Sequence, residues 1–161
     1  MRKGIRSPSK KRGKKPGRRS LKRIMGKKIV DANVVLRYLL RDDEELFKKS
    51  FVLLESVKIG EETIEIAESI LAECVYVLLK LYKVDRGVIA EKLNELLSYK
   101  GIANSDRADL VDALKIFGQT QLSIVDSILC AKALNRKMTL FTFDEELAKI
   151  YKKKSHHPEN R

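Results

Sequence analysis

Four acidic residues stand apart from the other charges of the chain and could together bind a metal ion. Asp31 and Asp144 each follow a short segment of strand-like composition, whereas Glu73 and Asp126 are each the only charge in an apolar, helix-like stretch. Carboxylates are hard oxygen ligands of the kind that Mg²⁺ and Mn²⁺ prefer. Like charges at close range are tolerable only with cations between them. If the fold gathers these four side chains, they predict a site for Mg²⁺ or Mn²⁺.

Each of the four acids also has a purely structural explanation. Asp31 and Asp144 could cap the helices that follow them, and Asp126 could form a capping-box-like pair with Ser123. Glu73 could pair with an arginine across the core, although buried ion pairs contribute little net stability. The metal-site hypothesis fails only if all four structural explanations hold at once. A shared metal site is therefore the simpler hypothesis.

The sequence offers little to support other chemistries. It contains neither the GxxxxGK[ST] phosphate-binding motif nor GxGxxG, and its only histidines are His156 and His157 at the polar end. A serine or cysteine nucleophile would need a histidine in the folded part of the chain. Cys74 and Cys130 lie in apolar, helix-like stretches and lack the spacing of metal ligands. We therefore expect both to be reduced thiols in the core of a cytoplasmic protein. No apolar run approaches the length needed to span a membrane.

The positions of the acids follow from an expected alternation of strands and helices. Hydrophobic periodicity and capping residues predict an α/β fold with a mainly parallel sheet. We expect strands at 29–30, 63–67, 102–103 and 138–143, and helices at 34–40, 42–60, 69–82, 85–97, 105–117, 123–135 and from 144 onward. Glycines 60 and 118 are expected to end two of these helices. Parallel strands would bring Asp31 and Asp144 to the same edge of the sheet, where ligands bind in open α/β folds.

Charge divides the chain into a basic tail and a neutral domain. Residues 1–24 hold 12 of the 34 Lys and Arg residues and none of the 22 acidic ones, so the formal net charge of +12 belongs to this segment. With almost no apolar residues it should be disordered and could contact nucleic acid. Met25 could be the natural start, in which case the tail is not part of the product. We expect the folded domain at 25–151 and a polar end at 152–161.

Four motifs in order resemble those of the PIN-domain ribonucleases, and most closely the toxin component of VapBC-type toxin–antitoxin modules. The motifs are IVDAN at 29–33 with LRYLL at 36–40, LAECVYVL at 71–78, VDSIL at 125–129 and FTFD at 141–144. The resemblance covers residues 27–150 and implies a three-layer PIN-like fold. It identifies Asp31, Glu73, Asp126 and Asp144 as the metal-binding quartet, with Asn33 and Thr142 as supporting polar residues.

The resemblance also implies an activity and partners. It implies hydrolysis of RNA phosphodiester bonds with Mg²⁺ or Mn²⁺, in which Asp31, Asp126 and Asp144 bind the metal directly and Glu73 holds a second ion or a metal-bound water. Ser123 stands where members often carry another acid, which puts full coordination of a second metal in doubt. A cognate antitoxin and a homodimer are the expected protein partners, and the apolar excess at Tyr76, Leu79 and Tyr82 agrees with such contacts.

Three other functions are alternatives to a metal-dependent nuclease. A receiver-like phosphoacceptor domain would need an acid pair near the end of the first strand and a late lysine, but Asp31 stands alone there. A haloacid-dehalogenase-type phosphatase would need its second aspartate at position 33, where this chain has Asn33. A metal-free RNA-binding module would use the basic tail and need none of the four acids. The sequence does not identify the RNA or the antitoxin.

Overall fold

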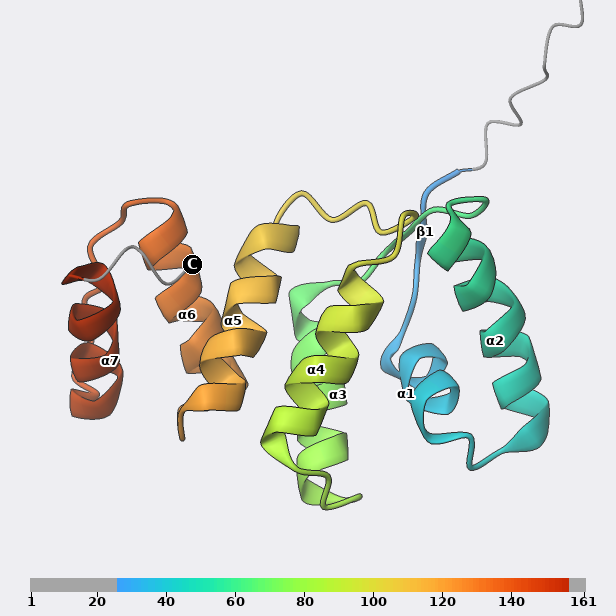
Figure 1. Cartoon of the computed structure of the whole chain (residues 1–161), viewed down its shortest axis with the longest axis horizontal. Coiled ribbons are helices and arrows are strands. Elements are labelled where there is room, and N and C mark those ends of the chain that lie inside the picture. Colours follow the sequence, from blue (N-terminus) through green and yellow to red (C-terminus); the bar gives the residue numbers. More distant parts are fainter. Residues whose placement is uncertain (1–25, 157–161) are drawn as a thin grey trace, which may run out of the picture.

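The computed structural model describes residues 26–156, and within them the helices stand in a row along one long axis (Figure 1). The chain forms β1 (Lys28–Ile29), α1 (Ala32–Leu40), α2 (Glu44–Ile59), β2 (Ile64–Glu65), α3 (Glu68–Lys80), α4 (Arg86–Leu97), α5 (Arg107–Gln119), α6 (Ile124–Asn135) and α7 (Glu145–His156). α2 lies at one end of the row and α7 at the other (Figure 1). The basic tail, Met25 and His157 lie outside the described residues.

A short parallel sheet holds the amino-terminal part together. β1 pairs in parallel with β2, and an isolated bridge joins Ile64 to Ile102. Asn104 extends this edge, because its side-chain amide both accepts a hydrogen bond from the Ile66 amide (3.0 Å) and donates one to the Ile66 carbonyl (2.8 Å). The predicted α/β class and parallel pairing are therefore confirmed, with strands shorter than expected.

One strand prediction fails in the described residues, and another strand is more exposed than its composition suggests. Segment 138–143 has no ladder hydrogen bonds, and Phe141 and Phe143 are 85% and 93% exposed. The expected first strand forms as β1, but its outer edge is unpaired and Ile29 is exposed. A strand needs a backbone partner as well as β-branched or aromatic residues; β1 has one in β2, whereas segment 138–143 has none among the described residues.

Local capping fixes the helix ends. Asp43 begins α2 by accepting a hydrogen bond from the Leu46 amide (2.9 Å), and Gly60 ends it in the left-handed conformation at φ 84°. The prediction that Gly118 ends α5 is wrong, because the helix continues through it to Gln119. A Cβ on Gly118 would lie 2.8 Å from that of Ala90, so glycine there permits close packing of α4 on α5 rather than a helix end.

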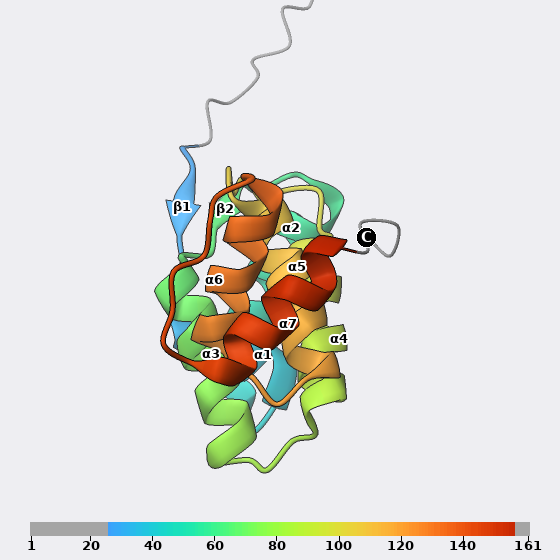
Figure 2. The same cartoon turned by 90° about the vertical axis from the view of Figure 1, so that its left-hand side faces the viewer.

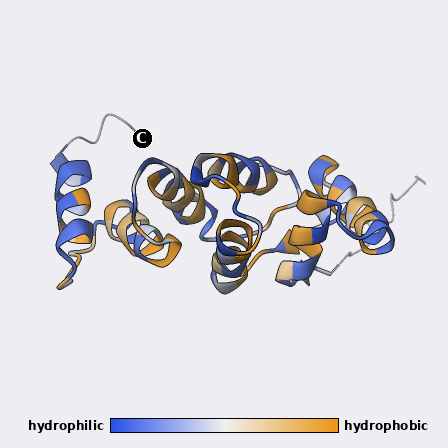
Figure 3. Cartoon of the chain, turned by 90° about the horizontal axis from the view of Figure 1, so that it is seen from below, coloured by the Kyte–Doolittle hydropathy of each residue, from blue (hydrophilic) through white to orange (hydrophobic). Residues whose placement is uncertain are grey.

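One continuous core joins the helices. Its fully buried members come from most elements and include Leu54, Ile64, Leu71, Leu93, Leu110, Phe117 and Ile128. Arg86 at the start of α4 reinforces the α4–α5 contact, since its guanidinium stacks over the Phe117 ring at 3.9 Å and donates hydrogen bonds to the carbonyls of Phe117 and Leu122. Hydrophobic residues face neighbouring helices, whereas α7 is mostly hydrophilic (Figure 3). No helix in the described residues is long and apolar enough to cross a bilayer.

Candidate metal-binding site

Asp31 lies where β1 passes into α1. Its backbone is extended (φ −89°, ψ 174°), and its Oδ1 accepts a hydrogen bond from the Val34 amide at 3.0 Å. The structural role foreseen for Asp31 as an N-cap is therefore observed. A carboxylate has about four lone-pair positions, so capping leaves most of the exposed carboxylate free. Asn33 lies in the first turn of α1 and is also exposed.

Glu73 is an exposed residue of α3, the helix that packs against α1. The link between them is the buried thiol of Cys74, which donates a weak hydrogen bond to the Ala32 carbonyl (3.9 Å). Burial, and then the negative charges of Glu73 and Asp31, raise the pKa of this thiol to about 12. Both charges act on the same thiol, Glu73 as the chain neighbour of Cys74 and Asp31 from the start of α1, so both acids belong to the region where α1 packs on α3.

Asp126 is held by Ser123 at the start of α6. The Ser123 hydroxyl donates to Asp126 Oδ2 (2.6 Å), and the Asp126 amide donates back to Ser123 Oγ (3.1 Å). This reciprocal pair is the capping-box-like arrangement that the sequence suggested. It leaves Asp126 half-buried with its second oxygen free of this pair. Ser123 therefore orients the carboxylate of Asp126 in addition to capping the helix.

Asp144 caps α7 in a similar way. Its Oδ1 accepts from the Leu147 amide (2.8 Å), and its own amide donates to Thr142 Oγ1 (3.0 Å). Thr142 thus fixes the backbone of the turn that presents Asp144. The carboxylate itself is exposed.

α6 and α7 present Asp126 and Asp144 at the same end of a helix pair. The carboxyl-terminal halves of the two helices face each other, since Tyr151 of α7 donates a hydrogen bond to the Met138 carbonyl just after α6 (3.0 Å). The helices therefore run in roughly the same direction, as Figures 1 and 2 show, and the extended segment 138–143 returns the chain to the end where α6 begins. Both acids lie at that end.

The four acids thus lie in two regions rather than in one quartet: Asp31 and Glu73 where α1 packs on α3, and Asp126 and Asp144 at the starts of α6 and α7. Among residues 26–156, no three His, Cys, Asp or Glu side chains are close enough to hold one metal ion between them. The two pairs lie on regions that meet mainly through α3 and α6, where Lys132 forms an ion pair with Glu68. Mg²⁺ is commonly bound by one or two carboxylates together with waters and substrate phosphates. In ligand type and number, each pair fits such an ion.

A groove of about 670 Å³ opens beside Asp31 at the unpaired edge of β1. Its wall is mostly apolar and is formed by Lys28, Ile29, Val30, Asp31, Val34, Leu53, Ala67, Ser69 and Ile70. Lys28, at its rim, is paired with Glu62 (2.5 Å). The groove gives a bound molecule access to the Asp31 carboxylate from outside the sheet.

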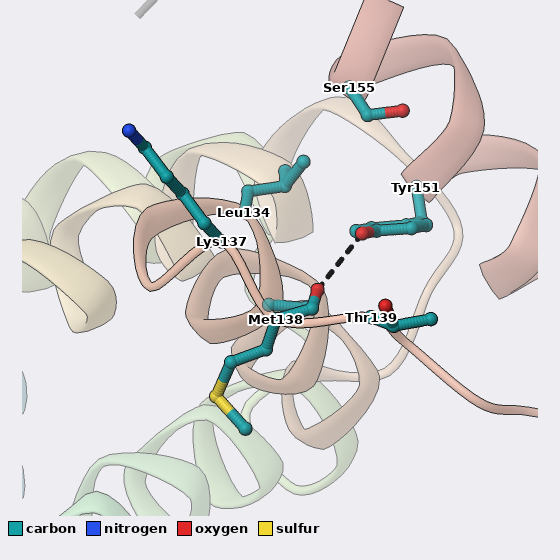
Figure 4. Close-up of a pocket in the computed structure, with 7 residues that line it drawn as sticks. Leu134, Lys137, Met138, Thr139, Tyr151 and Ser155 are labelled. Atoms are coloured by element: carbon teal, nitrogen blue, oxygen red, sulfur yellow. Dashed lines mark hydrogen bonds between the residues drawn. The ribbon is translucent and has the colours of Figure 1, made fainter.

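Sequence reasoning missed a second cavity, at the opposite ends of α6 and α7. This cavity of about 250 Å³ is lined by residues of both helices and of the turn between them, among them Lys137 and Tyr151 (Figure 4). The sequence predicts a polar end at 152–161, and the structure continues α7 into it as far as His156. In the sequence, the only local sign of this cavity is Tyr151 followed by the lysines at 152–154.

Comparison with known proteins identifies a family for this chain. The family model described as the PIN domain matches residues 28–153. Neither the curated proteins nor the solved structures contain a match. The matched region includes all four acids and the groove beside Asp31.

Proposed function

Since the chain belongs to the PIN domain family, whose members are generally nucleases, we propose that it is a metal-dependent endoribonuclease. The observation that supports this proposal most is the placement of the four acids within the matched region. Two of them, Asp31 and Glu73, lie where α1 packs on α3, and the charges of both act on the Cys74 thiol. The other two begin neighbouring helices and are oriented by hydroxyl groups.

The roles of the acids follow from their surroundings. We assign Asp31 as a direct ligand of one ion, with Glu73 as a further ligand or as the acceptor for a metal-bound water, and Asp126 and Asp144 as direct ligands of another ion. A bound Mg²⁺ or Mn²⁺ would supply an acidified water and stabilise charge on the scissile phosphate. Ser123 and Thr142 limit the motion of their acids, and Asn33 offers an exposed amide beside Asp31.

The carboxylates also govern access of the substrate. RNA carries a negative charge on every phosphate, so four uncompensated carboxylates repel it. Neutralising them is therefore a condition for binding as well as for hydrolysis. We expect productive RNA binding near Asp31 to require a divalent ion.

A direct test uses the purified full chain with transfer, ribosomal and messenger RNA. Each RNA is incubated with Mg²⁺, with Mn²⁺ and with a chelator, and the fragments are mapped. We expect internal cleavage of at least one RNA class with either ion and none with the chelator. Cleavage that persists with the chelator would contradict the metal requirement, and absence of cleavage of all three classes would contradict the nuclease.

We propose further that the nuclease is a toxin, that a cognate antitoxin binds it, and that it forms a homodimer. It is supported by apolar side chains left exposed around the α3–α4 connection, of which Tyr76 is 61%, Leu81 69% and Tyr82 44% exposed. Leu79 is half-buried and contributes less than expected. Sedimentation at tens of micromolar should show a dimer, and a Tyr76→Glu, Leu81→Glu variant should be monomeric; a wild-type monomer would contradict dimerisation.

We place this activity in the cytoplasm. Both described cysteines, Cys74 and Cys130, are free and buried, which suits a reducing compartment. Fractionation of the cells that produce the protein should recover it with cytosolic markers. Recovery in an oxidising compartment would contradict this assignment.

A metal-free RNA-binding module is the second candidate. Its support is that the acids of residues 26–156 form two pairs instead of one complete site. RNA binding that is unaffected by a chelator, without any cleavage, would favour this candidate over the nuclease.

A further inference from the structure

The outer edge of β1 has room for one more strand. The amides of Lys28 and Val30 donate to carbonyls of segment 63–65 at 3.0 and 3.4 Å. An edge strand presents unpaired N–H and C=O groups on its other side, and here these are the groups of Ile29, because in the described residues β1 pairs with β2 alone. The side chain of Ile29 is 73% exposed, and the mostly apolar groove beside Asp31 opens at the same edge.

Segment 138–143 has the complementary property. It is strand-like in composition, yet it has no ladder partner among the described residues. The rings of Phe141 and Phe143 are 85% and 93% exposed and contact each other edge to face, with 5.4 Å between their centroids. An exposed segment of this kind is a template for pairing with another chain.

Within one copy, segment 138–143 and β1 do not meet. Figure 1 shows β1 beside α1 and α2 toward one end of the row, whereas the segment runs beside α6 and α7 at the other end. Tyr151 donates to the Met138 carbonyl, and Leu147 of α7 is buried, so α7 is held on α6. The segment can reach its own β1 only if α7 leaves α6. It can reach the β1 of a second copy with these contacts intact.

The directions of the two elements suit an exchange between two copies. Figure 2 looks along the row of helices and shows β1 and segment 138–143 on the same flank, both running from the top of the view toward the bottom. A two-fold axis parallel to them reverses the row but preserves their direction. Each segment then lies parallel to the β1 of the other copy, and the assembly closes as a dimer.

The exposed face of α3 lies on the same flank and extends this surface (Figure 2). Ser69, Glu73 and Tyr76 are exposed and share one face of the helix. Ser69 also lines the groove beside Asp31. The surface therefore continues from the edge of β1 to Tyr76, which the homodimer described above is proposed to use. One interface can include both.

A parallel exchange also brings the separated acids together. Asp31 directly follows β1 and Asp144 directly follows segment 138–143, and the carboxyl ends of neighbouring parallel strands meet at one edge of a sheet. With Asp144 beside the partner's Asp31, Phe143 lies beside the partner's Val30, a residue of the buried core. Its exposed ring would then be covered by the apolar wall of the groove.

We propose that two copies exchange segment 138–143, which adds to the outer edge of β1 as a parallel strand. Each catalytic site then combines Asp31 and Glu73 of one copy with Asp126 and Asp144 of its partner. This proposal rests on the proposed nuclease and homodimer, and it explains why the described residues of one copy bring no three of these acids together. Because like charges at close range require cations between them, Mg²⁺ should strengthen the dimer.

The first test detects the exchange by disulfide cross-linking and does not depend on cleavage. Full chains carrying Ile29→Cys or Thr142→Cys, which are neighbours in this register, are given tags of different size, mixed when dilute, concentrated and oxidised. We expect a reducible heterodimer on a gel. Val52→Cys, at a position that is 68% exposed on α2, replaces Ile29→Cys as the matched control and should give none. The native thiols, Cys74 and Cys130, are buried.

Two results of the cross-linking would overturn the exchange. One is a heterodimer yield no higher than that of the Val52→Cys control, both for Thr142→Cys and for Leu140→Cys, which covers a register shift of two residues. The other comes from one chain that carries Ile29→Cys and Thr142→Cys together. If that chain forms a disulfide within the monomer while the mixtures give no heterodimer, its own segment fills the edge of β1.

The second test asks whether each site is shared between copies. Asp31→Asn and Asp144→Asn are each expected to be inactive, but a mixed dimer contains one site with both aspartates intact. Random pairing makes half of the dimers mixed, with one of two sites intact, so cleavage should return to about a quarter of wild type. The matched control mixes Asp31→Asn with Glu73→Gln, which lie in the same half of a site, and should recover nothing.

The two tests separate this proposal from the nuclease. Equal inactivity of both mixtures, with an active wild type, would overturn the shared site and retain the nuclease. A wild type that does not cleave RNA but gives the Ile29→Cys, Thr142→Cys heterodimer would refute the nuclease and retain the exchange.

Discussion

The two regions that hold the acids differ in how they hold them. Asp31 and Glu73 come from different elements, and the charges of both act on the buried Cys74 thiol where α1 packs on α3. Asp126 and Asp144 belong to one continuous stretch, where Ser123 and Thr142 position them through local hydrogen bonds. The first pair therefore depends on the core, whereas the second depends on side chains within three residues of each acid. Substitutions should separate the two dependencies.

Removing core volume should damage the first region most. Leu71 on α3 is 1% exposed, and Leu71→Ala should lower the free energy of unfolding by about 2–5 kcal/mol. Leu129→Ala on α6 is the matched control; this leucine is 47% exposed, so its change should stay within about 0.5 kcal/mol. Urea denaturation measures both, and equal losses would show that the two regions do not differ in this way.

Removing the local cap should affect the second region by a smaller amount. Ser123→Ala deletes the hydroxyl that bonds both the amide and the carboxylate of Asp126. Loss of an N-cap costs about 1 kcal/mol. Cleavage should fall as well, because the carboxylate loses its orientation, while Ser123→Thr should recover most of both losses. Denaturation and single-turnover cleavage of the two variants are the measurements, and a fully active Ser123→Ala would remove the orienting role.

Substitution of Cys74 should have the smallest effect on stability at neutral pH, but the pKa of its thiol depends on the charges of both Glu73 and Asp31. Burial, Glu73 and Asp31 raise the pKa of its thiol from 9.0 to about 12. The folded state therefore holds the proton more tightly than the unfolded state between these values, so stability is complete below about pH 9 and is lost as pH rises toward 12. Cys74→Ala should flatten that fall relative to wild type, whatever other groups titrate.

The charge contribution to the Cys74 pKa can be tested separately. Glu73→Gln removes the neighbouring charge with the larger effect on the thiol and should lower the pKa of Cys74. The pH dependence of iodoacetamide labelling in the folded protein measures this pKa. A labelling profile identical to wild type would show that Glu73 is not close to the thiol. The electrostatic link between Glu73 and the α1–α3 region would then lose its support.

The sequence predicts what is decided locally. Asp31, Asp43, Asp85 and Ser123 cap helices as their residue types suggest, because the bonds they make lie within three residues. Gly118 was mistaken for a helix end, since its real constraint is Ala90 on another helix. Segment 138–143 has strand composition but no backbone partner among the described residues, and pairing cannot be read from one segment alone.

The same distinction applies to the candidate site. Chemical type singled out the four acids, and local pattern placed them at helix starts and on α3. Their arrangement as two pairs depends on tertiary contacts such as α1 on α3, which no single motif encodes. The cavity at the carboxyl-terminal ends of α6 and α7 is not predictable from one motif either. Lys137 and Tyr151 both line it, although they are 14 positions apart along the chain.

The most direct test of the account compares two aspartates with the same capping geometry. Asp31 accepts from the Val34 amide at 3.0 Å and Asp43 accepts from the Leu46 amide at 2.9 Å, and asparagine caps a helix about as well as aspartate. Single-turnover cleavage of RNA with Mg²⁺ is measured for Asp31→Asn and Asp43→Asn alongside their melting temperatures. We predict a loss of roughly 100-fold or more for Asp31→Asn, with a melting temperature equal or higher because charge repulsion is relieved, and no loss for Asp43→Asn. A fully active Asp31→Asn would contradict the assignment of the metal-dependent site.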